Sequence, residues 1–185
     1  MSLFRTSLML TSMLATTTTF AVLPTVTLDP NASNPFPIQT TSTNGSINPI
    51  VNARPQLDNQ LFGYIVGTDA QGQESFIPVT AQTNVSAGNV IEYRGYITNN
   101  SPDRVRSMKV TYAIPANTEL LSTQVSPERA YGSADGQNFQ YMPLKTNASG
   151  TLQNLPMAYY KAVRWDIQGL GLNEVAEVKY RVRVK

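Results

Sequence analysis

From about residue 58 to the C-terminus, short runs of alternating hydrophobic and polar residues are separated by turn residues. The clearest run is the last, 176–184, where every second residue is apolar and every intervening residue is charged. A period of two places successive side chains on opposite faces of a strand, so this run is predicted to be a strand with one buried face. No stretch of twelve residues shows the 3.6-residue period of an amphipathic helix.

Further runs of the same kind predict strands at 61–67, 76–80, 90–98, 108–114, 121–125 and 161–167. Pro78 predicts an edge strand or a bulge in its run. Asp135-Gly136 predicts a two-residue type I′ hairpin between 131–134 and 137–141. Trp165 falls on the apolar face of its run, which predicts a tryptophan buried between two sheets. Many short strands in this length predict an all-β fold, an immunoglobulin-like two-sheet β-sandwich over residues 58–185.

Residues 1–21 have the pattern of a secretory signal peptide. Arg5 precedes an apolar stretch too short to span a bilayer, and small residues at 19 and 21 predict cleavage between Ala21 and Val22. No cysteine follows for a lipid anchor, and no second apolar run follows for membrane insertion. We therefore expect a secreted or periplasmic protein, or one held at the cell surface, with no membrane insertion after signal cleavage. A cytoplasmic protein with a polar N-terminus is the alternative.

Residues 22–57 are rich in Pro, Thr, Asn and Ser, and only three of the 26 charged residues (Arg5, Asp29 and Arg54) precede residue 58. Prolines rule out a continuous helix, so this segment is predicted to be an extended arm or linker. Its four residues Thr25, Val26, Thr27 and Leu28 alternate and favour β-structure. A sandwich has edge strands to which such a segment can add, in cis or in trans. The expected partner is a protein, or a second copy, at a strand edge; the alternative is a flexible spacer.

The composition restricts the chemistry. The chain contains no Cys and no His, which excludes disulfides, thiolate nucleophiles, Ser-His triads and zinc sites with Cys or His ligands. A turn explains Asp135 without a metal, and Glu174 and Glu177 are expected to be solvated surface acids. We therefore expect no catalytic residue, no metal and no cofactor, and a non-enzymatic structural or interaction role.

Two groups of side chains, a tyrosine pair and a basic stripe, are possible binding surfaces. Tyr159 and Tyr160 are candidate glycan contacts, which would make the protein a small carbohydrate-binding module with a polysaccharide partner. Lys179, Arg181, Arg183 and Lys185 form a basic stripe on one strand face, but a net charge of +2 is too small for a nucleic-acid partner. A solvated outer face is the expected explanation of the stripe.

Six short motifs occur in one order over residues 85–184: Ser86-Ala87-Gly88-Asn89, Ile97-Thr98-Asn99-Asn100 after Tyr93, Ile114-Pro115-Ala116-Asn117-Thr118, Ser133-Ala134-Asp135-Gly136, Val163-Arg164-Trp165 and Tyr180-Arg181-Val182-Arg183-Val184. In this order they resemble the "conserved repeat" domain, an immunoglobulin-like family of bacterial and archaeal surface and secreted proteins. The chain differs from that family in having a single copy and no Pro before Gly88. The resemblance implies the fold and an extracytoplasmic setting, and it implies no reaction.

Overall fold

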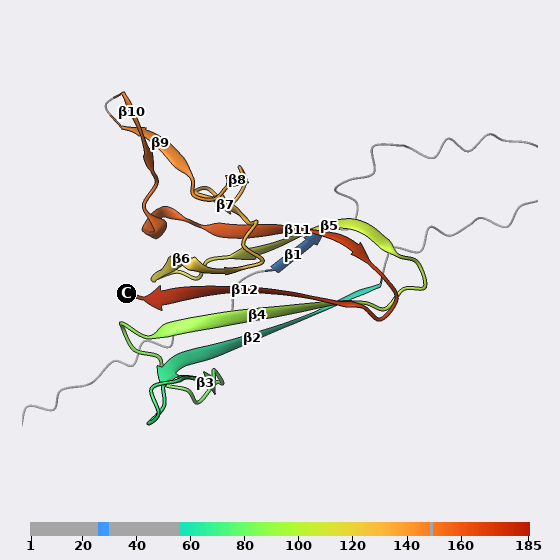
Figure 1. Cartoon of the computed structure of the whole chain (residues 1–185), viewed down its shortest axis with the longest axis horizontal. Coiled ribbons are helices and arrows are strands. Elements are labelled where there is room, and N and C mark those ends of the chain that lie inside the picture. The colour runs from blue at the N-terminus through green and yellow to red at the C-terminus, as the bar shows by residue number, and fades with distance from the viewer. Residues whose placement is uncertain (1–25, 30–55, 149) are drawn as a thin grey trace, which may run out of the picture.

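The computed structural model describes residues 26–29, 56–148 and 150–185, and these residues form an all-β fold of stacked antiparallel sheets (Figure 1). The predicted signal peptide, with the Ala21–Val22 cleavage site, lies outside the described residues, as do Thr25 and most of the arm. No helix within the described ranges is long and apolar enough to cross a membrane.

Each main sheet has five strands. Sheet A has the order β1 (Val26–Asp29), β5 (Val105–Ala113), β11 (Ala162–Leu170), β7 (Tyr131–Ser133) and β8 (Gln140–Tyr141). Sheet B has the order β3 (Glu74–Pro78), β2 (Leu57–Thr68), β4 (Val90–Asn99), β12 (Val175–Val184) and β6 (Thr118–Ser126). A separate hairpin, β9 (Lys145–Ala148) and β10 (Thr151–Asn154), precedes the short 3-10 helix η1 (Met157–Tyr159).

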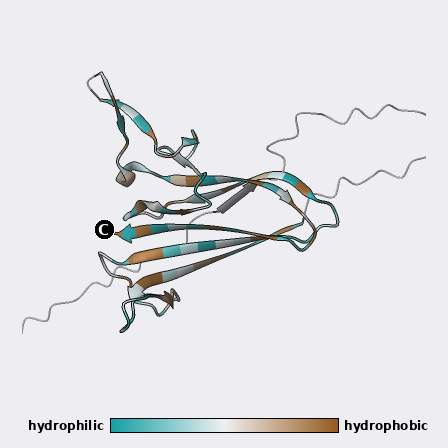
Figure 2. Ribbon diagram, viewed as in Figure 1, coloured by the Kyte–Doolittle hydropathy of each residue, from teal (hydrophilic) through white to brown (hydrophobic). Residues whose placement is uncertain are grey.

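The prediction of an all-β sandwich is confirmed. Hydrophobic and hydrophilic bands alternate along β4, β11 and β12 (Figure 2), as period-two patterning requires. In β12 the side chains of Val178, Tyr180, Val182 and Val184 are buried, while their neighbours face outward. The predicted strand containing Pro78 is β3, which lies at the edge of sheet B.

Aromatic rings fill the space between the sheets. Between the sheets, the ring centroid of Tyr180 in sheet B lies 6.1 Å from that of Tyr112 and 6.3 Å from that of Trp165 in sheet A. Within the sheets, Tyr93 stacks on Tyr180 at 5.2 Å and Trp165 packs edge-on against Tyr112 at 6.0 Å. All four side chains are at most 1% exposed, so the prediction of a buried Trp165 is confirmed. Its indole Nε1–H donates to the carbonyl oxygen of Pro127 at 3.1 Å. Gly95 makes room for this packing, because a Cβ there would lie 1.8 Å from the Tyr112 hydroxyl.

Two local features differ from the sequence prediction. The Asp135-Gly136 segment does connect paired strands, but Tyr131 pairs with Tyr141, so the connection is longer than a two-residue turn. The Asp135 carboxylate instead organises a wider loop, accepting hydrogen bonds from the backbone N–H groups of Gln137 and Asn138 and from the Ser133 hydroxyl. The hairpin of β9 and β10 was not predicted, because its exposed residues show no buried alternation.

Candidate functional site

The β1 strand forms an edge of sheet A. It comes from the N-terminal arm and pairs antiparallel with β5, with Val26 opposite Tyr112 and Leu28 opposite Val110. Residues 26–28 of the predicted strand-addition segment are thus in a strand, and the pairing is with the same chain. The next strand, β2, belongs to the other sheet. Residues 26–29 of the arm therefore form the outermost strand of sheet A among the described residues.

β1 covers only part of the edge beside it. It pairs with residues 109–112 of β5, while β11 pairs with β5 from Val105 onward. Within the described ranges, no strand pairs with residues 105–108 on the β1 side. In sheet B, β3 pairs with β2 only from Tyr64 to Thr68, so among the described residues the segment 57–62 of β2 has a strand neighbour on one side alone. We call these two segments, 105–108 and 57–62, the open edges.

A hydrogen bond connects the two strands that carry the open edges. The buried Tyr112 of β5 donates its hydroxyl to Asn59 Oδ1 of β2 at 2.9 Å. Since β5 and β2 each lie next to an outermost strand, this bond joins the two sheets along one side of the sandwich. Backbone N–H and C=O groups of an edge strand can pair with a further strand, so this side of the molecule is suited to strand addition.

A second surface, the outer face of sheet B, is organised around one buried carboxylate. Glu92 accepts hydrogen bonds from Arg94 Nε and Arg181 Nε, both at 2.6 Å, and its side chain is 6% exposed. Arg181 also forms a two-pronged ion pair with Glu74 of β3, at 2.7 and 2.8 Å. The bond to Glu74 and the charges of both carboxylates raise the pKa of Arg181, and Arg181 lowers the pKa of Glu74. The ion pair between Arg181 of β12 and Glu74 of β3 therefore links the edge strand β3 to β12 over the outer face of sheet B.

Replacing Glu92 by glutamine is expected to destabilise the fold by about 3 kcal/mol, near the lower limit for breaking a buried ion pair. The substitution leaves two guanidinium groups close together without the carboxylate that balances them. Glu74→Gln is the matched control: its carboxylate is exposed, so we expect a small loss that added salt removes. Urea unfolding followed by circular dichroism measures both variants. Equal losses in the two variants would contradict a central role for Glu92.

Aromatic rings surround the same arginines. The Arg94 guanidinium lies over the rings of Tyr64 and Phe76, at 4.9 and 4.5 Å from their centroids. Phe62 packs edge-on against Tyr96 at 5.9 Å and is 43% exposed. We call Phe62, Tyr64, Phe76 and Tyr96 the aromatic face. Its signal in the sequence is the presence of Phe62 and Tyr64 at alternate, outward positions of β2.

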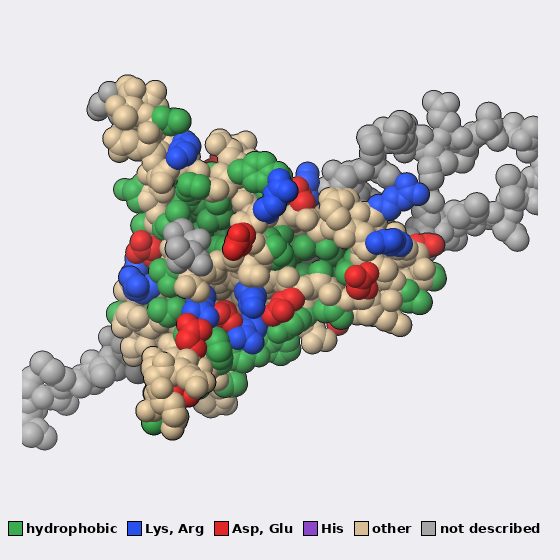
Figure 3. Space-filling model, in the orientation of Figure 1, with side chains coloured by type: hydrophobic (Ala, Val, Ile, Leu, Met, Phe, Trp, Pro, Cys, Tyr) green, Lys and Arg blue, Asp and Glu red, His purple; other side chains and the backbone are tan. Residues whose placement is uncertain are grey.

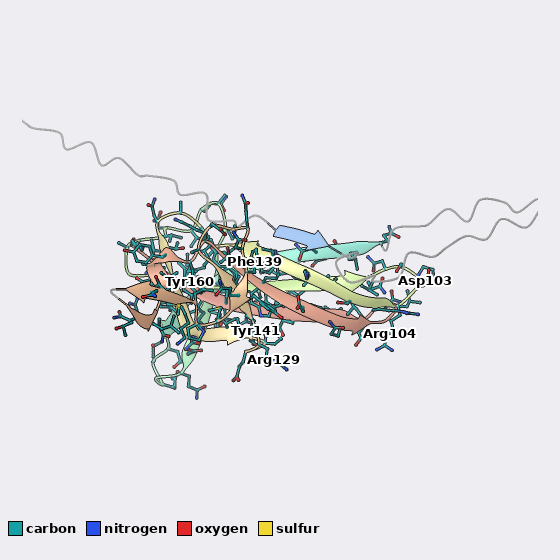
Figure 4. All side chains as sticks on the ribbon, turned by 90° about the horizontal axis from the view of Figure 1, so that it is seen from above. Asp103, Arg104, Arg129, Phe139, Tyr141 and Tyr160 are labelled. Carbon is teal, nitrogen blue, oxygen red and sulfur yellow. The ribbon has the colours of Figure 1, made fainter. Side chains whose placement is uncertain are left out.

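The predicted glycan contacts have opposite environments. Tyr159, in η1, is 61% exposed, whereas Tyr160 is 2% exposed and accepts a hydrogen bond from the Leu144 backbone N–H at 2.6 Å. Figure 4 shows Tyr160 and Tyr141 at the end of the sandwich opposite Asp103 and Arg104. Tyr141 is 57% exposed and stacks on Tyr131. The expectation that Tyr160 contacts a glycan is therefore wrong, because its ring is inside the core.

The basic stripe is not uniform either. Arg181 is held between two carboxylates, which corrects the view of the stripe as simply a solvated face. Elsewhere, acidic and basic side chains are interspersed on the visible surface (Figure 3). Glu174 and Glu177 also have separate partners: Glu174 accepts from the Gly171 N–H, and Glu177 accepts from the Tyr96 hydroxyl. Across the described part of the chain, no group of three acidic, His or Cys side chains is placed to hold a metal ion.

Comparison with protein-family models, with curated proteins and with solved structures finds no match for the chain. Membership of the conserved repeat family stays a prediction from the motifs.

Proposed function

We propose that this chain is an exported, non-enzymatic immunoglobulin-like module with a structural or interaction role at the cell surface, and that its N-terminal arm is the interacting element. The observation that carries the proposal is the pairing of β1 with β5 at the edge of sheet A. A segment well separated from β5 in sequence forms a strand there, which supports the proposal that this edge can take an added strand.

Two properties of the chain support an interaction role. An added strand gains main-chain hydrogen bonds and needs no catalytic group, and the chain has no Cys or His. The arm also has little charge, so its docking on an edge is not opposed by the desolvation of charged side chains. The signal-peptide pattern supports export, with a mature chain that begins at Val22.

The test compares three forms of the chain expressed with its own leader in an exporting bacterial host. The full chain is expected to leave the cytoplasm, to give an N-terminal sequence starting at Val22, and to remain with the cell-surface fraction. Deletion of residues 22–55 and the substitution Leu28→Pro, which removes an N–H and disfavours pairing, are expected to release the exported protein into the medium.

Two results would contradict the proposal. A chain that begins at Met1 in the cytoplasm excludes export. Equal surface retention of the full chain, the deletion and Leu28→Pro excludes the arm as the interacting element. Circular dichroism of the Leu28→Pro variant checks that the sandwich itself is folded.

A carbohydrate-binding module is the second candidate, and the aromatic face favours it. Sugar rings stack on exposed aromatic side chains, and Phe62 is exposed beside the polar side chains of Asp58 and Gln60. For this function, retention on insoluble polysaccharide should be lost in Phe62→Ala and kept in Leu28→Pro. The same retention measured for Tyr159→Ala tests the glycan contact that the sequence suggested; if the aromatic face is the binding surface, this variant should still be retained.

A further inference from the structure

We infer that the partner of the arm is a second copy of this chain: the β1 strand of one copy replaces β1 on the β5 edge of another. The inference rests on the function proposed above, in which the arm is the interacting element, and it names the partner. The edge that β1 occupies belongs to the same chain, so every copy carries both the strand and the site that receives it.

The length of chain between β1 and β2 permits this exchange. Asp29 stands opposite Lys109, four residues from the start of β5, and the sheets of a sandwich lie about 10 Å apart. The β2 strand begins at that same end, because Leu57 pairs with Asn99, whose side chain donates to the carbonyl oxygen of Leu170, and Leu170 pairs with Val105. A direct path from β1 to β2 is therefore about 25 Å.

The 27 residues 30–56 that make this connection are many more than it needs. At about 3.3 Å per residue they have a maximum reach of about 90 Å. The longest strand, β2, has 12 residues and is about 40 Å long. The connection is thus long enough to carry β1 past its own domain and onto the β5 strand of a neighbouring copy.

The structure also contains a reason for the exchange to be favourable. When β1 pairs with its own β5, the open edges at 105–108 and 57–62 have no strand neighbour among the described residues. A second copy that supplies its β1 is brought to this same side of the sandwich, where its surface can cover them. Exchange keeps the pairing of β1 with β5, and contacts of the second copy at the open edges would add to it.

The concentration of the protein decides whether β1 pairs with its own β5 or with the β5 of another copy. A tether gives the intramolecular strand an effective concentration of about millimolar. A dilute chain is therefore expected to pair β1 with its own β5, and chains crowded at a surface are expected to exchange. This arrangement keeps the edge covered before assembly, which protects it from unrelated strands.

The test uses single cysteines, since the chain has none of its own. Thr27 of β1 stands opposite Thr111 of β5, and residues opposite each other in an antiparallel pair lie within disulfide distance. A Thr27→Cys variant is mixed with a tagged Thr111→Cys variant under oxidised glutathione, at about 10 µM and about 1 mM. Neither variant can form this disulfide alone, so a mixed, tagged dimer on a non-reducing gel reports exchange.

Two matched controls define the expected result. Replacing the partner by Gln153→Cys, an exposed position on β10, measures random oxidation. Adding Leu28→Pro to the Thr27→Cys chain keeps the thiol and disables the strand. We expect about tenfold more mixed dimer with Thr111→Cys than with either control, and a yield that rises with concentration.

A yield equal to the controls at both concentrations would overturn the inference. The double variant Thr27→Cys/Thr111→Cys then separates the causes: an intramolecular disulfide, with surface retention of the wild type unchanged, leaves the arm as the interacting element with a different partner. If the double variant forms no disulfide, the pairing of β1 with β5 is wrong, and the proposed function loses its supporting observation as well.

Discussion

Raising the pH above 10 is expected to unfold this protein with a slope of about 4 kcal/mol per pH unit, because burial strongly raises the pKa of three of its core tyrosines. Burial raises the pKa values of Tyr93, Tyr112 and Tyr180 well above the usual value, and for Tyr180 the charges of the other two phenolates add to the effect. These side chains are at most 1% exposed. The folded state therefore keeps these tyrosine hydroxyls protonated at a pH at which the unfolded chain has lost the protons.

The direction follows from proton linkage. A phenol whose folded-state pKa is raised contributes stability that is complete below its unfolded pKa of about 10 and is lost as the pH rises beyond it. Each phenol contributes about 1.4 kcal/mol per pH unit, which gives the slope above for three. A domain with a stability of about 5–15 kcal/mol is then expected to unfold by about pH 12 or 13.

Urea unfolding at a series of pH values measures the slope, and tyrosinate absorbance reports the titration. Tyr180→Phe, which keeps the ring and removes one hydroxyl, is expected to reduce the slope to about two thirds. Tyr159→Phe is the control, because this ring is exposed in the folded protein as well. Titration of all tyrosines near pH 10 without unfolding would show that the core phenols are accessible to solvent.

Replacing Trp165 by alanine is expected to lower the free energy of unfolding by about 3–5 kcal/mol. The indole is 1% exposed, packs against Tyr112 and Tyr180, and donates a hydrogen bond to the carbonyl oxygen of Pro127. Alanine leaves a cavity between the sheets and an unpaired carbonyl oxygen. Denaturant unfolding followed by circular dichroism measures the loss.

Trp165→Phe separates the ring from the hydrogen bond, and we expect it to be less destabilising than alanine. Tyr159→Ala, at an exposed position, is expected to change stability by less than about 0.5 kcal/mol. In the wild type, the single tryptophan should emit at short wavelength and resist quenching by acrylamide. A red-shifted, easily quenched emission together with a small loss in Trp165→Ala would contradict the burial of Trp165.

The sequence was sufficient to predict the strands that have one buried face. In β12 each buried side chain alternates with a charged one, and no helix can produce that pattern. The same reasoning placed Trp165 in the core. It failed for β9 and β10, whose residues are almost all exposed, because a hairpin without a buried face leaves no periodic signal.

The candidate surfaces were harder to predict, because they depend on which strands are neighbours. The sequence assigns Arg181 to the same stripe as Lys179 and Arg183, and only the pairing of β12 with β4 places it opposite Glu92. Similarly, Tyr159 and Tyr160 are adjacent in sequence, and the 3-10 turn that ends at Tyr159 separates their environments. The prediction for the arm was correct in part: the β-preference of its residues indicated a strand, but nothing in the local sequence identified β5 as the neighbouring strand.

The hairpin of β9 and β10 projects from the body of the sandwich (Figure 1). All four residues of β10 are exposed, including Leu152 at 69%, and neither strand pairs with either main sheet. Lengthening this hairpin would thus leave both main sheets and their core packing intact. The hairpin is therefore an insertion point at which an epitope or a fluorescent label would lie outside the core of the sandwich.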